Sequence, residues 1–459
     1  MISVRGRASA VVAGAALLAA AMGLDACAAY HARPLPAAAD TASGAGALKV
    51  DVARLRLAPL KPIVVDARDG LDPIEIAVLA VLNSPDLAAK RAADRVDEAE
   101  VFAAGLLPDP QITLSIDNPI AGPDNLTAYG IAPSIDVAAL LARSNTLRAA
   151  RFTAQAANLD LLWAEWTTAQ QARGLAETAL SNERRIAFLR QVLGAASDRY
   201  ARSEAALERR DVSLQTTAAD LAVKLDAQTQ LATAQHDAAK ARRDLNALLN
   251  LDADVVLPLV AGPGESAYDA TSLTQAGASL AQRRPDLLAL QAGYQAGDAR
   301  LRQAILAQFP LSSVGGAYAR DTAGSVTQGL SAGLALPIFN GGRGEVRVQD
   351  ATREQLRAEY QARLDQTDAE VKNAEAELAN ARTQAAALRD EVPRLEALVQ
   401  PAIAAYGRGD IDSQTYLTLS QNALSRRADL DDREETARLA EIALETALFL
   451  PPASSRAAP

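Results

Sequence analysis

The chain of 459 residues is acidic, with 46 lysine and arginine residues against 56 aspartate and glutamate residues. This balance argues against a nucleic-acid partner, because little positive charge is available to neutralise phosphates. The single cysteine, Cys27, excludes an internal disulfide. The two histidines, His31 and His236, lie outside any cluster of metal ligands, so no metal or cofactor is expected. Low aromatic content and long alanine-rich stretches favour closely packed helices.

The first 27 residues have the order of a secretory signal. Arg5 and Arg7 form a short basic region, residues 8–24 are apolar, and Leu24-Asp25-Ala26-Cys27 closes the segment. A membrane-spanning helix is the alternative, because the apolar run approaches the ~20 residues that cross a bilayer. The ending also resembles the signal of bacterial lipoproteins, in which the cysteine becomes the acylated first residue. That resemblance, with Ala28 after the cysteine, implies a lipid at Cys27 and transport to the outer membrane.

The sequence contains an internal duplication at a spacing of 200 residues. Pro85-Asp86-Leu87 recurs as Pro285-Asp286-Leu287, and at the same spacing Ala99, Pro110 and Arg143 match Ala299, Pro310 and Arg343. Each copy is predicted to hold a helix, two strands and a very long helical hairpin, in that order. The first helices are expected at residues 75–106 and 273–307, each interrupted by a Pro-Asp step. Ser84-Pro85 is expected to be the cap and first turn after the interruption.

Four segments are predicted to be strands, because apolar and polar residues alternate along residues 111–117, 128–137, 311–320 and 329–338. Pro133 lacks an N–H group, so a bulge is expected there. About ten residues is the length that crosses a bilayer at a tilt, with the apolar side outward. A soluble sheet with one face in water is the alternative.

Two helices are predicted to be very long, at residues 143–200 and 343–406, spanning roughly 90 Å each. Returning helices at residues 211–249 and 413–450 complete two antiparallel hairpins. In the second, apolar residues alternate in steps of three and four, as in a coiled coil; they are Val371, Ala374, Leu378, Ala381, Ala385, Leu388, Val392 and Leu395. Pro393 is expected to bend this helix. The charged residues between the seam positions are predicted to form a solvated face; they are Glu370, Lys372, Glu375, Glu377 and Arg382.

If the strands cross a membrane, the chain must oligomerise. Four strands cannot close a barrel, and unpaired backbone groups at an open edge cost several kcal/mol each in hydrocarbon. Several copies would therefore close the barrel together.

Four stretches of sequence resemble the TolC-type outer-membrane efflux family; they are Gly70-Leu71-Asp72-Pro73-Ile74-Glu75 with Asn83 to Leu87, Leu106 to Gln111, Gln282-Arg283-Arg284-Pro285-Asp286-Leu287, and Leu336-Pro337-Ile338-Phe339-Asn340-Gly341-Gly342-Arg343. The last is the most specific, because Gly341, Gly342 and Arg343 mark the turn from the last strand into a long helix. Paired glycines there supply backbone angles that other residues resist. The resemblance covers residues 71–450.

The resemblance implies a mainly α fold with a small β part. Three identical chains would pool their strands into one transmembrane β-barrel, and their helical hairpins would form a tunnel across the periplasm. The implied partners are a periplasmic adaptor protein, an inner-membrane transporter (the proton-driven type favoured) and outer-membrane lipid, with no nucleic acid and no cofactor. The implied function is the exit duct of a tripartite efflux system for small molecules, drugs or metal ions.

The tips of the two hairpins are the predicted gate, because they close the tunnel in this family. Some members latch the tip through a tyrosine and an arginine bonded to an aspartate of the neighbouring hairpin. Tyr406 and Asp211 match the first and last of these, while Ile411 occupies the arginine position and Arg408 is close enough to substitute. Asp410 and Asp412 could ring the opening and favour cations. Solvated loop charges are the alternative.

Other classes of protein remain as alternatives. They are an outer-membrane component of type I protein secretion and a periplasmic coiled-coil adaptor or scaffold lipoprotein. An enzyme is not expected, since no nucleophile–base pair or phosphate loop is present. The expected organisation is a signal at residues 1–27, an extended segment at 28–70, repeats at 71–250 and 276–450 separated by a linker at 251–275, and a tail at 451–459.

Overall fold

The computed structural model describes residues 30–51, 53, 55–57, 60, 63, 65, 70–124, 126–262, 270–336 and 338–452. The predicted signal, Cys27 and Pro337 lie outside these residues. The chain divides into two units, residues 1–41 and 42–459. In the first unit, the described residues 30–41 are exposed and form neither helix nor strand.

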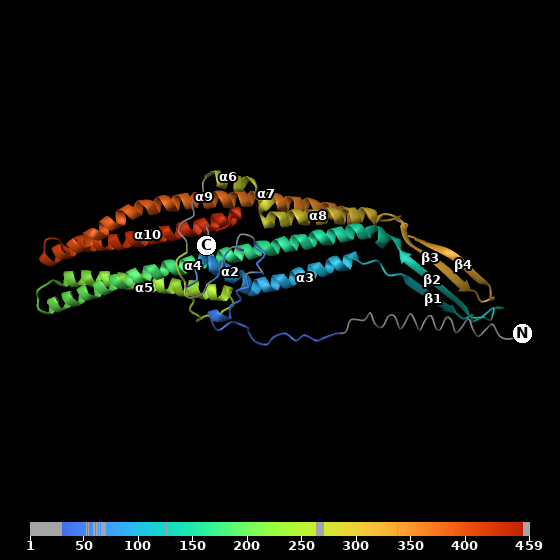
Figure 1. Ribbon diagram of the computed structural model, residues 1–459, viewed down its shortest axis with the longest axis horizontal. Helices are drawn as coiled ribbons and strands as arrows, with labels where there is room; N and C mark the ends of the chain where they lie inside the picture. Colours follow the sequence, from blue (N-terminus) through green and yellow to red (C-terminus); the bar gives the residue numbers. More distant parts are fainter. Residues whose placement is uncertain are drawn as a thin grey trace. The chain divides into compact units, whose positions relative to one another are not determined.

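The second unit holds the helices and strands. In chain order they are η1 (Ala45–Ala47), α2 (Pro73–Asn83), α3 (Pro85–Gly105), β1 (Gln111–Asp117), β2 (Ala128–Asp136), α4 (Val137–Glu208), α5 (Leu214–Leu248), α6 (Ala270–Ala278), α7 (Leu280–Arg283), α8 (Pro285–Leu306), β3 (Leu311–Arg320), β4 (Val326–Leu334), α9 (Arg343–Arg408) and α10 (Ser413–Leu448). Within this unit, the hairpins α4–α5 and α9–α10 lie side by side at one end and the sheet lies at the other (Figure 1). The fold is therefore mainly α with a small antiparallel sheet, as predicted.

The duplication is visible in the order of elements. Pro85 and Pro285 begin α3 and α8, and the first strand of each copy begins at residues 111 and 311. Both prolines occupy the first helical turn, where a missing N–H group leaves no hydrogen bond unmade. The copies then diverge, because β2 runs directly into α4 at Asp136, whereas residues 335–342 separate β4 from α9.

The sheet has four antiparallel strands in the order β1-β2-β3-β4, so β1 and β4 are its edges. The predicted strands 111–117 and 311–320 are confirmed to the residue. The strand expected at 329–338 instead spans Val326–Leu334. Leu334 pairs with Leu311, the first residue of β3, so residues beyond it have little partner strand left to pair with.

The bulge predicted at Pro133 is wrong. Pro133 pairs with Ile112 in an unshifted β1–β2 register, and Ile131 and Ser134 pair with β3 in one constant register. The ladder to β3 skips only Ala132 and Pro133, since proline has no N–H to donate. The register shift of the sheet lies instead between β3 and β4, at Leu311 to Ser313.

The alternation along the strands gives the sheet two different faces. Ile112, Leu114 and Ile116 of β1 lie opposite Pro133, Ile131 and Tyr129 of β2. Tyr318 and Leu330 continue the same face across β3 and β4. These apolar side chains are exposed, up to 94% for Leu330. The other face carries small and polar residues such as Ser115, Gly130 and Ser331.

The long helices extend further than predicted. The α4 helix has 72 residues, about 110 Å at 1.5 Å per residue, and α9 has 66. The side chain of Asp136 accepts a hydrogen bond from the backbone N–H of Ala139 at 2.8 Å, which begins α4 six residues before the expected Arg143. The α9 helix continues through both Pro393 and Pro401. The bend at Pro393 remains a prediction.

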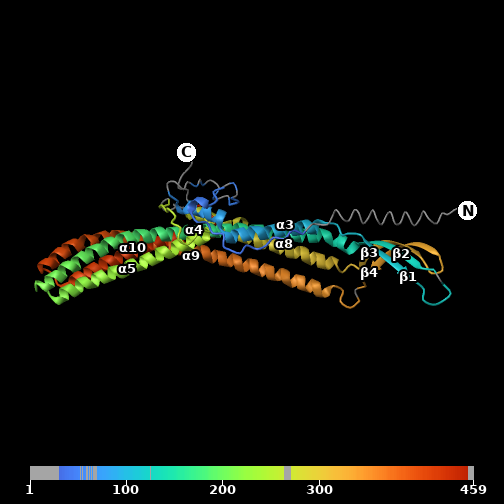
Figure 2. The same ribbon diagram turned by 90° about the horizontal axis from the view of Figure 1, so that it is seen from below.

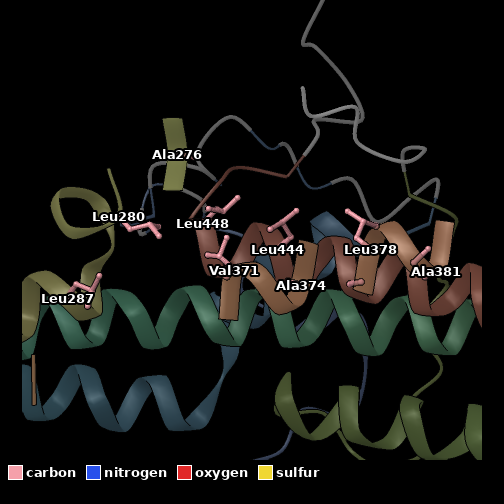
Figure 3. Close-up of a cluster of buried hydrophobic side chains, with 12 residues drawn as sticks. Ala276, Leu280, Leu287, Val371, Ala374, Leu378, Ala381, Leu444 and Leu448 are labelled. Atoms are coloured by element: carbon pink, nitrogen blue, oxygen red, sulfur yellow. The ribbon is translucent and has the colours of Figure 1, made fainter. Parts of the chain in front are cut away.

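One of the main hydrophobic clusters is a seam of apolar side chains along α9. Seven of the eight predicted seam residues are buried, and only Leu395 is half-buried. Val371, Ala374 and Leu378 of α9 pack against Leu444 and Leu448 of α10 (Figure 3). Alanine at alternate positions lets the two helix axes approach closely, which confirms the coiled-coil prediction.

In the described part of the chain, no helix is long and apolar enough to cross a membrane. Among the same residues, no group of three or more histidine, cysteine or carboxylate side chains could hold a metal ion.

Candidate functional site: the tips of the helical hairpins

The tip of each hairpin is a tight, well-capped turn. Arg210 closes the α4–α5 turn with φ +63°, and Gly409 closes the α9–α10 turn with φ +81°. Ser213 and Asp412 cap the returning helices by accepting hydrogen bonds from backbone N–H groups at 3.2 and 2.7 Å. These caps satisfy backbone N–H groups in the first turn of each returning helix.

The structure places four of the predicted gate residues in contacts within their own turns. Asp211 accepts a hydrogen bond from Arg209 at 3.0 Å, and Asp410 accepts one from Arg408 at 2.8 Å. The side chains of both of these pairs, Arg209 with Asp211 and Arg408 with Asp410, are exposed. The backbone hydrogen bond from Thr415 lowers the pKa of Asp412 below its ordinary value, because the cap stabilises the charged form.

Tyr406 is not bonded to Asp211 in this structure. Its hydroxyl is buried and has no hydrogen-bond partner among the described residues. Its ring instead stacks on that of Tyr416, with the centroids 4.8 Å apart and the planes 7° from parallel.

Four side chains, one from each helix of the two hairpins, form what we call the tip clasp: Arg199 of α4, Asp220 of α5, Tyr406 of α9 and Tyr416 of α10. The guanidinium carbon of Arg199 lies 4.7 Å from the ring centroid of Tyr406 and 4.3 Å from that of Tyr416. Asp220 accepts a hydrogen bond from the same guanidinium, with its Oδ1 2.6 Å from Arg199 Nε. The clasp therefore ties the first hairpin to the second.

The clasp is largely removed from water. The side chain of Asp220 is 1% exposed, and that of Arg199 is 15% exposed. Burial raises the pKa of Tyr416, and the nearby charge of Arg199 only partly offsets this. A desolvated cation over an aromatic ring contributes about 2 kcal/mol, so this contact helps to hold the two hairpins together near the tips.

The sequence analysis missed Arg199, Asp220 and Tyr416. Tyr416 lies ten residues from Tyr406, and only the reversal of the chain at Gly409 brings the rings together. The signal that could have been used is that each of the four helices carries one of these aromatic or charged residues within about four turns of its tip.

A second polar cluster lies where α8 begins, far from the tips. Arg284 is fully buried and forms a bidentate ion pair with Asp286. Its Nε donates to Oδ1 at 2.9 Å and its Nη2 donates to Oδ2 at 3.1 Å. It also donates to Glu370 of α9 at 2.8 Å and to the backbone carbonyl of Ala447 in α10 at 3.1 Å. Arg363 bonds to the same two carboxylates at 2.8 and 2.7 Å.

The prediction of a solvated face is therefore wrong for Glu370. Burial acts to raise its pKa, but hydrogen bonds from Arg284 and Arg363 lower it below the ordinary value. Arg382 is also only partly exposed and lies 3.4 Å from the buried Glu441. Lys372, by contrast, is exposed and pairs with Asp368 of its own helix. The sequence could not separate these cases, because all lie at non-seam positions of one helix.

The glycine turn before α9 has the predicted geometry. Gly341 and Gly342 have φ values of +58° and +69°, in the left-handed region that glycine adopts without strain. Gln308 donates to the carbonyl of Gly341 at 2.8 Å, and Arg343 is the first residue of α9. The role of this turn is thus to fix the start of a helix.

The sequence matches no protein-family model and no curated protein. The structure, in contrast, is similar to solved outer-membrane channels. The CmeC outer-membrane channel of Campylobacter jejuni has 16% sequence identity and a TM-score of 0.69, over 92% of this chain and 94% of that one. The outer-membrane channel OprN has 16% identity and a TM-score of 0.70, over 92% of this chain and 99% of that one.

CusC, described for its folding and transmembrane channel formation, has 19% identity and a TM-score of 0.67, over 83% of this chain and 92% of that one. The fold is that of outer-membrane channel proteins. It is the TolC-type fold that the sequence resemblance predicted, and its solved examples are channels rather than enzymes.

Proposed function

We propose that this chain is one protomer of a homotrimeric, lipid-anchored outer-membrane channel that serves as the exit duct of a tripartite efflux system for small molecules. The observation that carries the proposal is the sheet. It has one exposed apolar face and two edge strands, β1 and β4. A face of this kind is suited to hydrocarbon, but unpaired edges are not.

Closure by identical copies resolves the conflict at the edges. Each chain supplies four strands, so three copies would supply about twelve, enough for a barrel with an open interior. Pairing of β4 with β1 of the next copy would satisfy the backbone groups at both edges at once. The similarity to solved outer-membrane channels supports the same location for this chain.

The helices give the proposed duct its length. At 72 and 66 residues, α4 and α9 reach roughly 100 Å beyond the sheet, a span suited to crossing the periplasm. The tips would then face the inner membrane, where a periplasmic adaptor and an inner-membrane transporter would meet them. A lipid at Cys27 would add a second anchor in the outer membrane.

The tip clasp is the proposed gate, because it joins the two hairpins at the narrow end of such a duct. Release of Arg199 from Tyr406 and Tyr416 would let the second hairpin move relative to the first. Asp410 and Asp412 are exposed beside the clasp, and in three copies they would ring the opening with carboxylates. Such a ring favours the passage of cations.

The test uses the full chain expressed in a Gram-negative host. We expect it in the outer-membrane fraction, extracted by detergent as a trimer by light scattering, and conducting in planar bilayers. Labelled palmitate should enter the wild type but not Cys27→Ser. In a strain that lacks its own exit duct, restored resistance to small toxic molecules supports efflux, whereas restored release of a secreted protein would favour type I secretion. A water-soluble monomer that does not conduct would refute the proposal.

A further inference from the structure

A pocket lies on one face of the layer of helices that adjoins the sheet. The order across this layer is α3, α4, α8 and α9, with each neighbouring pair in contact (Figures 1 and 2). All four helices line the pocket, near the ends that α3 and α8 direct towards the sheet. Its volume of about 480 Å³ is in the range of sites that bind drug-sized molecules.

The lining of the pocket combines small apolar side chains with charged groups of both signs. Its apolar side chains are those of Ala104, Ala149, Ala150, Ala304 and Ala307. Its charged side chains are those of Glu100 in α3, Arg300 in α8 and Glu345 in α9. Because alanine side chains are short, they leave room for an apolar molecule between the longer charged side chains.

The charged groups have unused capacity for hydrogen bonds. Arg300 donates from Nη2 to the hydroxyl of Thr153 at 2.8 Å, and a guanidinium has further N–H donors besides this one. Glu345 already accepts a hydrogen bond from Gln349 at 2.8 Å. Glu100, by contrast, has no hydrogen-bond or ion-pair partner within the described part of the chain. A carboxylate and a guanidinium on either side of α4 are therefore both able to bind a ligand.

The large exposed apolar residues next to the sheet lie on the other face of the layer. Phe102 of α3, Leu141 of α4 and Ile305 of α8 are 71%, 46% and 49% exposed. At 3.6 residues per turn, each lies on the side of its helix that points away from the pocket residues. An apolar face next to the hydrocarbon is the outer face of the proposed channel, so the pocket opens to the interior of the duct.

We propose that this pocket is a transit site for zwitterionic small molecules, in which Glu100 binds an ammonium group, Arg300 binds a carboxylate and the alanine side chains pack against the apolar body. The inference rests on the proposed function and names a class of cargo. A purely cationic molecule would be repelled by Arg300, and a purely anionic one would be repelled by the two glutamates. A phosphatidylethanolamine head group carries the same two charges, but its acyl chains would need the apolar face on the other side of the layer.

The exposure of the charged groups makes binding at this site weak. Glu100 and Arg300 are both exposed, and an exposed ion pair raises affinity by roughly fivefold at most. Weak binding suits a conduit, because a molecule must leave the site as readily as it enters. The pocket would therefore lengthen the stay of a zwitterion in the duct without trapping it.

The experiment is fluorescence titration of the full-chain trimer in lipid nanodiscs with three dansyl probes. Dansyl-lysine, labelled on its α-amino group, carries an ammonium group and a carboxylate. Dansylcadaverine carries only the ammonium group, and dansyl-aminohexanoate carries only the carboxylate. We expect the zwitterion to bind about threefold to fivefold more tightly than either singly charged probe. Titration of empty nanodiscs corrects for partition of the probes into lipid.

Neutral variants separate the two contacts. Glu100→Gln should weaken the binding of dansyl-lysine and dansylcadaverine by about threefold to fivefold, but not that of dansyl-aminohexanoate. Arg300→Gln should weaken the binding of dansyl-lysine and dansyl-aminohexanoate, but not that of dansylcadaverine. The matched controls are Glu98→Gln and Arg302→Gln, which make the same changes of charge at exposed positions on the opposite sides of α3 and α8. Both controls should leave all three affinities unchanged.

The comparison of the three probes on the wild type needs no substitution, so it tests the site even where a variant fails to fold. Equal affinities of the three probes, or equal losses in a variant and its matched control, would overturn the inference. A trimer that conducts in planar bilayers but gives either result refutes the transit site alone. A water-soluble monomer that does not conduct refutes the proposed function as well.

Discussion

Removal of the buried Arg284 is expected to weaken the contact of the start of α8 with α9 and α10. Breaking a buried ion pair by removing one partner costs about 3–5 kcal/mol when the other charge is left uncompensated. Here Asp286 and Glu370 keep hydrogen bonds from Arg363 at 2.8 and 2.7 Å. The carbonyl of Ala447 loses its side-chain donor, and the ring of Trp163, 4.4 Å from the guanidinium, loses its cation.

Arg284→Ala should therefore cost less than an orphaned pair, about 2–3 kcal/mol. Arg363→Ala should cost about 1 kcal/mol, since the fully buried Arg284 still serves both carboxylates. The double variant leaves both carboxylates without a cation, so its cost should exceed the sum of the single costs by about 1–2 kcal/mol.

The assay is denaturant unfolding of the purified protein, followed by far-ultraviolet circular dichroism. Lys372→Ala is the control, because its exposed pair with Asp368 should contribute nothing measurable. Additive costs in the double variant, or a larger cost for Arg363→Ala than for Arg284→Ala, would refute the view that the two arginines share the same carboxylates.

Three further predictions concern the tips and the glycine turn. Arg199→Ala should raise single-channel conductance and uptake of large antibiotics, because it removes the cation from the tip clasp. Arg209→Ala is the control and should leave both unchanged, because the contact of Arg209 stays within its own turn. Equal effects of the two variants would count against the clasp as the gate. Asp412→Ala should loosen the start of α10, which would be seen as faster amide hydrogen exchange there. The cap lowers the pKa of the Asp412 carboxyl below its ordinary value of 3.8. The wild-type amides should therefore stay protected from exchange above pH 3.8 and lose this protection as the pH falls through the lowered pKa. Gly342→Ala should cost about 1–2 kcal/mol in thermal unfolding, since φ is +69° and a Cβ would lie 3.0 Å from Gln308 Cγ. Gly293→Ala, with open space around the added methyl group in α8, should be neutral or stabilising, and the reverse order would contradict the strain argument.

Periodic features were predictable from the sequence because the physics behind them is local. The α9 seam follows from the 3.5-residue repeat, and β1 follows from strict alternation of side chains. The alternation is weakest in β3, where only Val314 and Tyr318 are clearly apolar on their face. The start of α8 at Pro285 follows from the same rule that starts α3 at Pro85. Each of these depends on residues within one turn or one strand of each other.

Features that depend on chain reversal were not predictable. The contact of Arg199 with Tyr416 joins residues on helices α4 and α10, more than 200 positions apart. The half-buried position of Glu370 depends on its ion pair with Arg284, which lies between α7 and α8. The early start of α4 was missed for a different reason. An aspartate at position 136 fits the polar face of a strand as well as it fits a helix N-cap.

The two connections that lead from the sheet into the long helices, β2 to α4 and β4 to α9, differ in length. On one side Asp136 ends β2 and caps α4, so strand and helix share one backbone with no residue between them to absorb a rotation. On the other side residues 335–342 intervene between β4 and α9. A tilt of α4 must therefore twist β2 with it, while a tilt of α9 is taken up in the connection. Movement at the hairpin tips would therefore be transmitted to the sheet through α4, but residues 335–342 would absorb the movement of α9.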